Sequence, residues 1–244
     1  MVEPRVLVGC PTFQGKAYCL NEYLEGLESL TCQNAEVYLV DNSKTGEYAR
    51  LLEEKARDWS DRTGKKFGVH RMAENVEPVR RRIVDCRNFL REKALHEGFE
   101  YFLSLEQDVI PPANAIEQLL ACKKGLCSAL YLNELQGPGQ LRAVAFQQRG
   151  VDNKGEPLIA SLRLVDCLPG RLMEVSHTGL GCMLISCSVL EKTCFRFEEG
   201  KPAWDDIFFC MDATRAGFPV FLNSQVACMH WFNESFYRTV KGNA

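Results

Sequence analysis

The sequence predicts an α/β protein whose mixed, mostly parallel sheet is flanked by helices and carries an added antiparallel segment. Two observations support this prediction. Short apolar runs alternate with helical patterns through residues 1–133, which is the order expected of βαβ units. After residue 133 the apolar runs are separated by turn signals such as Gly150 to Gly155, and this spacing favours antiparallel strands.

Residues 1–133 hold the clearer pattern. Apolar runs predict strands at residues 5–10, 36–40, 67–71, 101–105 and 126–132. Helices are predicted at residues 18–30, 47–62, 79–96 and 114–122. In the first of these helices Leu20, Tyr23, Leu24 and Leu27 recur at helical intervals. Pro11 is expected to end the first strand abruptly.

Residues 134–244 are expected to complete the sheet differently. The segment at 140–176 is predicted to add short antiparallel strands to the main sheet. Further elements are predicted as a strand at 182–185, a helix at 205–216 and strands at 220–222 and 226–230. Gly217 would stop the helix. No repeat or linker divides the chain, so one unit is a simpler prediction than two small domains.

Composition and charge exclude several classes of protein. With 46% hydrophobic and 25% charged residues, the chain of 244 residues resembles an ordinary globular protein. A formal net charge of −3 argues against a globally basic nucleic-acid binder. No apolar run approaches the roughly 18 residues that a membrane helix needs, and no signal-peptide pattern opens the sequence. We therefore expect a soluble, cytoplasmic protein.

The cysteines are numerous but scattered. The twelve are Cys10, Cys19, Cys32, Cys86, Cys122, Cys127, Cys167, Cys182, Cys187, Cys194, Cys210 and Cys228. No Cys-x-x-Cys pair occurs, and no pair of histidines follows at zinc spacing. Small buried thiols in a reducing compartment are the favoured interpretation; a structural zinc site or a disulfide is the alternative.

Two common nucleotide-binding loops are missing after the first strand. The segment Gly9-Cys-Pro-Thr-Phe-Gln-Gly15 does not have the G-x-G-x-x-G spacing of dinucleotide oxidoreductases. It does not match the phosphate-binding G-x-x-x-x-G-K-[ST] loop either, although Lys16 follows. Ligands of open α/β sheets bind outside the carboxyl ends of the strands, so the polar residues at those ends are the candidates.

Three polar clusters follow predicted strands, and they are Pro11-Thr12, Asp41-Asn42-Ser43 and Glu106-Gln107-Asp108. Glu106 and Asp108 project to the same face of a strand end because side chains alternate with period two. Paired carboxylates suit Mg²⁺ or Mn²⁺ held together with substrate phosphates. The alternative is that both acids only solvate the strand end.

Later in the chain, two acids and a histidine are candidates. Asp205 and Asp206 open a predicted helix, where one acid can serve as the cap and Asp206 could act as a general base. His230 ends an apolar strand and could be either a structural side chain or a metal ligand.

Basic and aromatic residues add weaker candidates. Arg71, the run Arg80 to Arg82 and Arg87 could attract a diphosphate or an anionic acceptor, or could form a solvated helix face. Trp204 could stack on a sugar or simply pack.

These motifs together resemble a family-2-type glycosyltransferase with the GT-A (Rossmann-like) fold. The pieces, in chain order, are Val6-Leu-Val-Gly-Cys-Pro-Thr12, Val37-Tyr-Leu-Val-Asp-Asn-Ser43, Cys86-Arg-Asn88, Phe102-Leu-Ser-Leu-Glu-Gln-Asp108, Thr178-Gly-Leu-Gly-Cys-Met-Leu-Ile185, Trp204-Asp-Asp206 and His230. Each motif is unspecific alone, but the series spans almost the whole chain in the family's order. The resemblance implies a nucleotide-sugar-binding half at 1–133 and an acceptor-binding half at 134–244.

The resemblance also implies roles for individual residues. Nucleotide-sugar contacts fall on Pro11, Thr12, Asp41, Arg87, Asn88, Glu106, Gln107, Gly179 and Gly181. Asp108 and His230 match the family's metal ligands, so Mn²⁺ or Mg²⁺ is the implied cofactor. The catalytic base falls on the pair Asp205 and Asp206, of which Asp206 occupies the family's position. Here Glu106 replaces the first Asp of the family's D-x-D motif, and Asp205 replaces a Glu.

The activity implied is an inverting, metal-assisted transfer of a sugar from a UDP- or GDP-type donor to an acceptor hydroxyl. The acceptor stays open among a glycan, a lipid-linked sugar, a protein and a modified nucleic acid. A non-catalytic nucleotide or glycan binder and a sugar-phosphate nucleotidyltransferase are the alternatives. The nucleotidyltransferase is disfavoured because its Gly-rich, Arg-containing loop after the first strand is missing.

Overall fold

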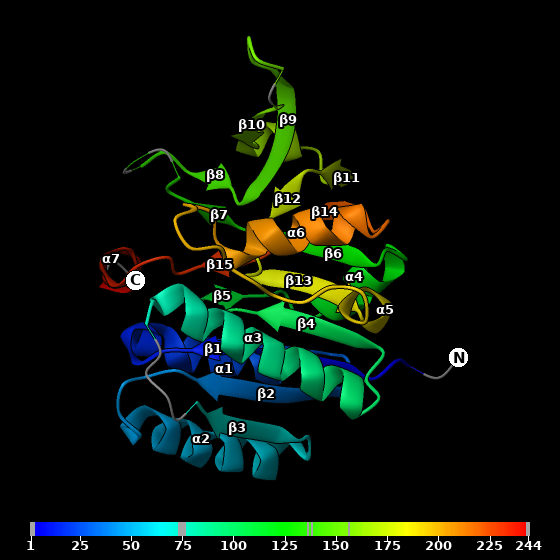
Figure 1. The fold of residues 1–244 in the computed structure, drawn as a ribbon. Coiled ribbons are helices and arrows are strands. Elements are labelled where there is room, and N and C mark those ends of the chain that lie inside the picture. Colours follow the sequence, from blue (N-terminus) through cyan, green and yellow to red (C-terminus); the bar gives the residue numbers. More distant parts are fainter. Residues whose placement is uncertain (1–2, 73–76, 136, 138, 156, 243–244) are drawn as a thin grey trace.

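A mixed sheet of eight strands forms the centre of the protein. The computed structural model describes residues 3–72, 77–135, 137, 139–155 and 157–242. The strands of the main sheet are β1 (Val6–Thr12), β2 (Ala35–Asp41), β3 (Phe67–Arg71), β4 (Tyr101–Leu105), β6 (Leu126–Leu130), β11 (Leu172–Val175), β13 (Cys182–Ser186) and β14 (Val220–Ala227). Their order is β11-β14-β6-β13-β4-β1-β2-β3 (Figure 1). Only β11 and β13 run against the other six, which confirms the predicted mixed, mostly parallel sheet.

Helices cover both faces of this sheet. They are η1 (Gln14–Cys19), α1 (Leu20–Ser29), α2 (Glu47–Thr63), α3 (Val79–His96), α4 (Ala115–Ala121), η2 (Leu164–Cys167), α5 (Cys187–Leu190), α6 (Asp205–Arg215) and α7 (Glu234–Gly242). Residues of α1, α2 and α4 share one buried cluster with the sheet, and residues of α3, α5 and α6 share another. None of the helices in the described part of the chain is long and apolar enough for a membrane crossing.

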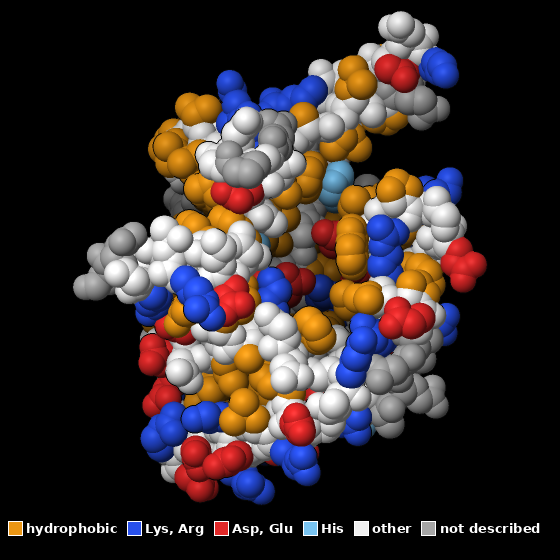
Figure 2. All heavy atoms as spheres, turned by 90° about the vertical axis from the view of Figure 1, so that its left-hand side faces the viewer, with side chains coloured by type: hydrophobic (Ala, Val, Ile, Leu, Met, Phe, Trp, Pro, Cys, Tyr) orange, Lys and Arg blue, Asp and Glu red, His pale blue; other side chains and the backbone are white. Residues whose placement is uncertain are grey.

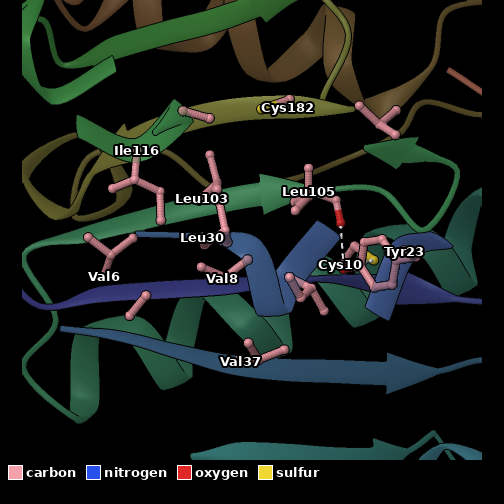
Figure 3. Close-up of a cluster of buried hydrophobic side chains, with 14 of the residues drawn as sticks. Val6, Val8, Cys10, Tyr23, Leu30, Val37, Leu103, Leu105, Ile116 and Cys182 are labelled. Atoms are coloured by element: carbon pink, nitrogen blue, oxygen red, sulfur yellow. Dashed lines mark hydrogen bonds between the residues drawn. The ribbon is translucent and has the colours of Figure 1, made fainter. Parts of the chain in front are cut away.

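Strand alternation decides which side chain enters which cluster. In β1, Val6 and Val8 join the cluster of α1, α2 and α4, whereas Leu7 joins the other cluster. Figure 3 shows the first cluster, where the hydroxyl of Tyr23 donates a hydrogen bond of 2.9 Å to the carbonyl of Leu105. This bond fixes α1 against the end of β4, directly before the predicted site residues at 106–108.

The first strand does not stop at Pro11 as predicted. β1 continues to Thr12 and pairs with β2 through Thr12↔Asp41. On its other side β1 pairs with β4 only as far as Gly9. Pro11 therefore has a neighbouring strand on one side alone, where its missing N–H group is tolerated.

The segment at 140–176 also differs from the prediction, because most of it leaves the main sheet. The remaining strands are β5 (Val109–Ile110), β7 (Leu132–Asn133), β8 (Arg142–Ala143), β9 (Ala145–Val151), β10 (Pro157–Ser161), β12 (His177–Thr178) and β15 (Met229–His230). β9 pairs with β10 and β12 in a separate three-stranded sheet, and β7 pairs with β8. Within this segment only β11 joins the main sheet.

At the C-terminal end, residues 220–227 form one strand with a register shift, where two strands were predicted. Met229 and His230 pair instead with β5. Helix α7 was not predicted, and its residues are all at least partly exposed. Its position is fixed by Tyr237 and Lys241, which both contact Glu22 of α1, at 2.7 and 2.9 Å.

A cavity should lower the free energy of unfolding most at the centre of the sheet. Leu103 of β4 is fully buried, whereas Leu51 of α2 is 39% exposed. We expect Leu103→Ala to lower the free energy of unfolding by about 2–5 kcal/mol. The matched change Leu51→Ala should alter it by no more than about 0.5 kcal/mol. Urea denaturation measures both, and equal losses would contradict this description of the core.

Candidate active site

Two adjoining cavities lie at the carboxyl ends of β1, β2 and β4. Their volumes are about 310 and 570 Å³, and we call them the first and the second cavity. The two cavities share the lining residues Lys16, Ile83, Arg87, Glu106 and Asp108. Figure 2 looks onto this edge of the molecule, where acidic and basic side chains meet in a central hollow.

The first cavity has apolar walls with a few polar groups. Pro11, Phe13, Val79 and Ile83 line it together with the amide side chain of Asn42. Phe13 is 46% exposed although it is aromatic. Walls of this kind suit a planar ring that also carries hydrogen-bonding groups.

The second cavity is rich in carboxylates. Glu106, Asp108, Asp205 and Asp206 line it, and its Lys and Arg lining residues are Lys16 and Arg87. Its aromatic lining residues are Tyr131, Phe146, Trp204 and Phe232. The excess of negative charge favours a cation or a hydroxyl-rich ligand, and it would repel an unassisted anion.

Asp108 is held between two nitrogen-bearing side chains. Its Oδ2 atom forms an ion pair with the Lys16 ammonium and lies 3.4 Å from Nε2 of His230. The pairing of β15 with β5 places His230 opposite Val109, which directly follows Asp108. Burial raises the pKa of Asp108, but the hydrogen bond from His230 and the charges of His230 and Lys16 outweigh burial and lower it.

The chemistry of Asp108 and His230 fits a divalent cation. Nδ1 of His230 lies 2.8 Å from the carbonyl of Leu132 and donates to it, which leaves Nε2 facing Asp108 and the second cavity. Metal-binding histidines in proteins commonly hold their second nitrogen in this way. No group of three or more His, Cys, Asp or Glu side chains with metal-binding geometry occurs among the residues described. A metal held here would therefore need further ligands from water or from a bound anion.

Arg87 connects three elements behind the cavities. It is 4% exposed and donates to Oγ of Ser104 at 3.0 Å and to Glu106 at 2.5 Å. Its Nε atom forms an ion pair with Asp205 at 2.7 Å. One guanidinium is thus shared between the carboxylates of Glu106 and Asp205.

The two acids that open α6 therefore have different environments. Burial, and then the charge of Asp205, raise the pKa of Asp206 to about 7 from an ordinary 3.8. Asp206 accepts a hydrogen bond of 2.8 Å from the N–H of Ile207, whereas Asp205 is paired with Arg87. A buried carboxylate whose pKa is raised toward neutrality is typical of acid–base sites. The arrangement favours Asp206 over Asp205 as a proton acceptor near neutral pH.

Nine of the thirteen predicted site residues line the cavities. They are Pro11, Arg87, Glu106, Gln107, Asp108, Gly179, Asp205, Asp206 and His230. The other four, Thr12, Asp41, Asn88 and Gly181, are not lining residues. Asp41 is fully buried and accepts hydrogen bonds from Ser43, and Asn88 binds the backbone of Phe195 through both amide atoms.

Gly179 and Gly181 are required by close packing. Tyr131 lies against both glycines and its hydroxyl accepts a hydrogen bond of 3.0 Å from the N–H of Gly181. A Cβ atom on Gly181 would come within 2.6 Å of the Tyr131 ring. These glycines therefore bring the loop against the aromatic wall of the second cavity.

The arginines at the predicted basic helix start have different roles. Arg80 donates to the carbonyls of Lys201 and Pro202 and lies 4.8 Å from the Trp204 ring, so it holds the loop before α6. Arg82 lines the first cavity and contacts Glu77.

The sequence analysis did not identify Phe13, Lys16 and Tyr131 as site residues. For Phe13 and Lys16 the available signal was their position directly after the first strand.

Most of the cysteines are small buried thiols, as the sequence predicted. Nine of the twelve are buried, Cys122 and Cys228 are partly buried, and Cys194 is exposed. All are free thiols in the structure.

Comparisons with known proteins support the fold. No protein-family model matches the sequence, and no curated protein matches it in sequence. GalNAc-T7 with UDP, GalNAc and Mn²⁺ matches with a TM-score of 0.67 at 13% identity, covering 98% of this chain and 48% of that one. The mannosyltransferase PcManGT from Pyrobaculum calidifontis, in complex with GDP-Man and Mn²⁺, matches at 0.60 and 15% identity, covering 99% and 61%. S. aureus TarS in complex with UDP matches at 0.58 and 16% identity, covering 97% and 63%.

These likenesses confirm that the chain has the GT-A fold expected from its motifs. The chain spans less than two thirds of the length of each of these three structures.

The raised pKa of Asp206 should make the free energy of unfolding depend on pH. The unfolded chain loses this proton near pH 4 and the folded chain near pH 7, so the Asp206 contribution weakens the folded state as pH rises from about 4 to 7. Asp206→Asn removes that contribution. We expect its free energy of unfolding, relative to the native protein, to rise across this range and level off above it.

Urea denaturation at pH 4 to 8 measures this difference. The control Asp205→Asn removes a partner of the buried Arg87 and should destabilise the protein at neutral pH instead. If the free energies of unfolding of Asp206→Asn and the native protein differ by the same amount at every pH, the raised pKa of Asp206 is contradicted.

Proposed function

We propose that the chain is a glycosyltransferase that moves a sugar from a nucleotide-diphosphate sugar to an acceptor hydroxyl, with a divalent metal and inversion at the anomeric carbon. One observation carries this proposal. The second cavity combines Asp108 and His230, which suit a cation, with Asp206, a carboxylate whose pKa is raised to about 7. The GT-A fold adds support, because the matched structures are glycosyltransferases or contain UDP, GDP-Man and Mn²⁺.

The donor nucleotide would occupy the first cavity. The base would lie between Phe13 and the apolar side chains of Pro11 and Val79, with Asn42 in reach of its polar edge. Stacking on an aromatic side chain is worth about 1–3 kcal/mol per base. The diphosphate would then extend toward Asp108, which lines both cavities. Residues 1–133 thus supply the donor site, and a UDP- or GDP-type donor is proposed.

Asp108 and His230 would hold the metal, Mn²⁺ or Mg²⁺. When bound, the ion supplies positive charge that compensates the diphosphate as it leaves. The second cavity needs such compensation because its lining carries four carboxylates against Lys16 and Arg87.

Asp206 would act as the general base. Its pKa of about 7 allows it to be ionised at neutral pH while still accepting a proton from a weakly acidic hydroxyl. Direct displacement by the hydroxyl that it activates inverts the anomeric carbon. Retention of the donor's anomeric configuration in the product would contradict this part of the proposal.

The acceptor would enter through the rest of the second cavity. Phe146, Trp204 and Phe232 line it, and aromatic side chains of this kind suit the apolar face of a sugar ring. Residues 134–244 supply these side chains, so this half is proposed to select the acceptor. The acceptor class stays among a glycan, a lipid-linked sugar, a protein and a modified nucleic acid.

Nucleotide binding tests the donor site. We expect UDP or GDP with Mn²⁺ to raise the melting temperature, because ligand at about a hundred times its dissociation constant stabilises by about 2.7 kcal/mol. The shift should shrink in EDTA and in Asp108→Asn. No shift with UDP, GDP or their sugar conjugates at millimolar concentration would refute the donor site.

The general base is tested by turnover. Asp206→Asn should slow the release of UDP or GDP from nucleotide sugars about 10²–10⁴-fold, the usual contribution of a positioned base. Its nucleotide affinity should stay within about twofold of the native protein. The matched control Asp58→Asn, on the exposed surface of α2, should change neither quantity. Unchanged turnover in Asp206→Asn would remove Asp206 from the base role and favour a binding protein.

A further inference from the structure

The Lys16 side chain occupies the place of a cation. Its ammonium lies against Oδ2 of Asp108, the same oxygen that faces Nε2 of His230. We propose that Lys16 is an internal cation that holds Asp108 until the donor arrives and then moves to the diphosphate, so that nucleotide and divalent metal bind cooperatively. This inference rests on the proposed function.

A metal ion and the Lys16 ammonium cannot share Oδ2 of Asp108. An ammonium next to a divalent cation in a partly buried site is strongly repelled, because the side chains of Asp108 and His230 are only 6% and 8% exposed. Metal binding to the nucleotide-free protein must therefore displace Lys16 into the cavity. That displacement weakens metal binding in the absence of the donor.

The backbone of Lys16 is fixed while its side chain can move. The N–H of Lys16 donates to the carbonyl of Phe13, and its own carbonyl accepts from the side chain of Gln107, both at 2.9 Å. The Lys16 side chain is 37% exposed, in contrast to the buried Asp108. A long, flexible stem on a fixed backbone lets the ammonium leave Asp108 without rearranging η1.

A diphosphate would attract Lys16 rather than the neighbouring arginine. Lys16 and Arg87 are the two Lys or Arg side chains that line both cavities. Arg87 is buried and is paired with Glu106 and Asp205, so its charge is already compensated. Among the described residues Lys16 forms an ion pair with one carboxylate, that of Asp108, and a metal can replace the ammonium on this carboxylate.

The consequence is a reciprocal coupling between two ligands. A diphosphate that binds Lys16 frees Asp108 for the metal, and a metal on Asp108 frees Lys16 for the diphosphate. By thermodynamic linkage, each ligand must raise the affinity of the other by the same factor, and factors of roughly 5–150 are usual for such coupling.

Mn²⁺ titration separates this coupling from activity. Free Mn²⁺ is measured by electron paramagnetic resonance, with and without saturating UDP or GDP, whichever nucleotide raises the melting temperature more. For the native protein we expect the nucleotide to tighten Mn²⁺ binding at least about tenfold. In Lys16→Gln, Mn²⁺ alone should bind at least about tenfold more tightly, and the nucleotide in EDTA should bind more weakly.

Two further variants serve as controls. Lys16→Arg keeps a cation beside Asp108 and should retain weak Mn²⁺ binding in the absence of nucleotide. Lys192→Met removes one positive charge from an exposed position after α5 and should leave every affinity within about twofold. Should Lys16→Gln fail to fold, Lys16→Met measured in the same way takes its place.

The outcomes separate the inference from the proposed function. If nucleotide and Mn²⁺ bind the native protein but the Lys16 variants leave Mn²⁺ affinity within twofold, the inference is overturned and the donor site stands. If neither UDP nor GDP binds the native protein with Mn²⁺, the proposed function fails and the inference fails with it.

Discussion

The ion pairs of one buried guanidinium organise the cleft. Arg87 of α3 contacts Ser104 on β4, Glu106 at the end of that strand and Asp205 at the start of α6. A buried cation without partners would cost several kcal/mol, so these three elements can hardly separate without exposing it to water. Arg87 pairs with Glu106 and Asp205 but with neither Asp108 nor Asp206, so these two acids have environments of their own.

Those separate environments give the two remaining acids different chemistry. Asp108 lies beside Lys16 and His230, which lower its pKa and keep it ionised as a partner for cations. Asp206 is desolvated and close to another carboxylate, so its pKa is raised to about 7 and it can take up a proton. A cation site and a proton acceptor facing one cavity is the arrangement that our proposed sugar transfer requires.

Local sequence patterns predicted several strands and helices at the bounds that the structure shows. The bounds of β3, α3 and β4 agree with the predicted ranges. The prediction failed at Pro11, which β1 tolerates because β4 has already diverged, and at 140–176, where turn signals indicate hairpins but not which sheet they join.

The site was predictable to a similar extent. Strand-end positions and the family resemblance identified Asp108, Asp206 and His230, which all line the second cavity. The role of Lys16 was not predictable, because its partner Asp108 lies 92 positions away in the sequence. The burial of Asp41 could not be foreseen either, since it depends on how the turn at Ser43 packs.

A crystal structure of the protein with UDP or GDP and Mn²⁺ tests the central claim most directly. Our account predicts the base beside Phe13, Mn²⁺ on Asp108 and His230, the Lys16 ammonium on the diphosphate, and the Asp206 carboxylate facing the position of the sugar. A nucleotide bound outside the two cavities, or a diphosphate whose Mn²⁺ does not contact Asp108, would contradict it.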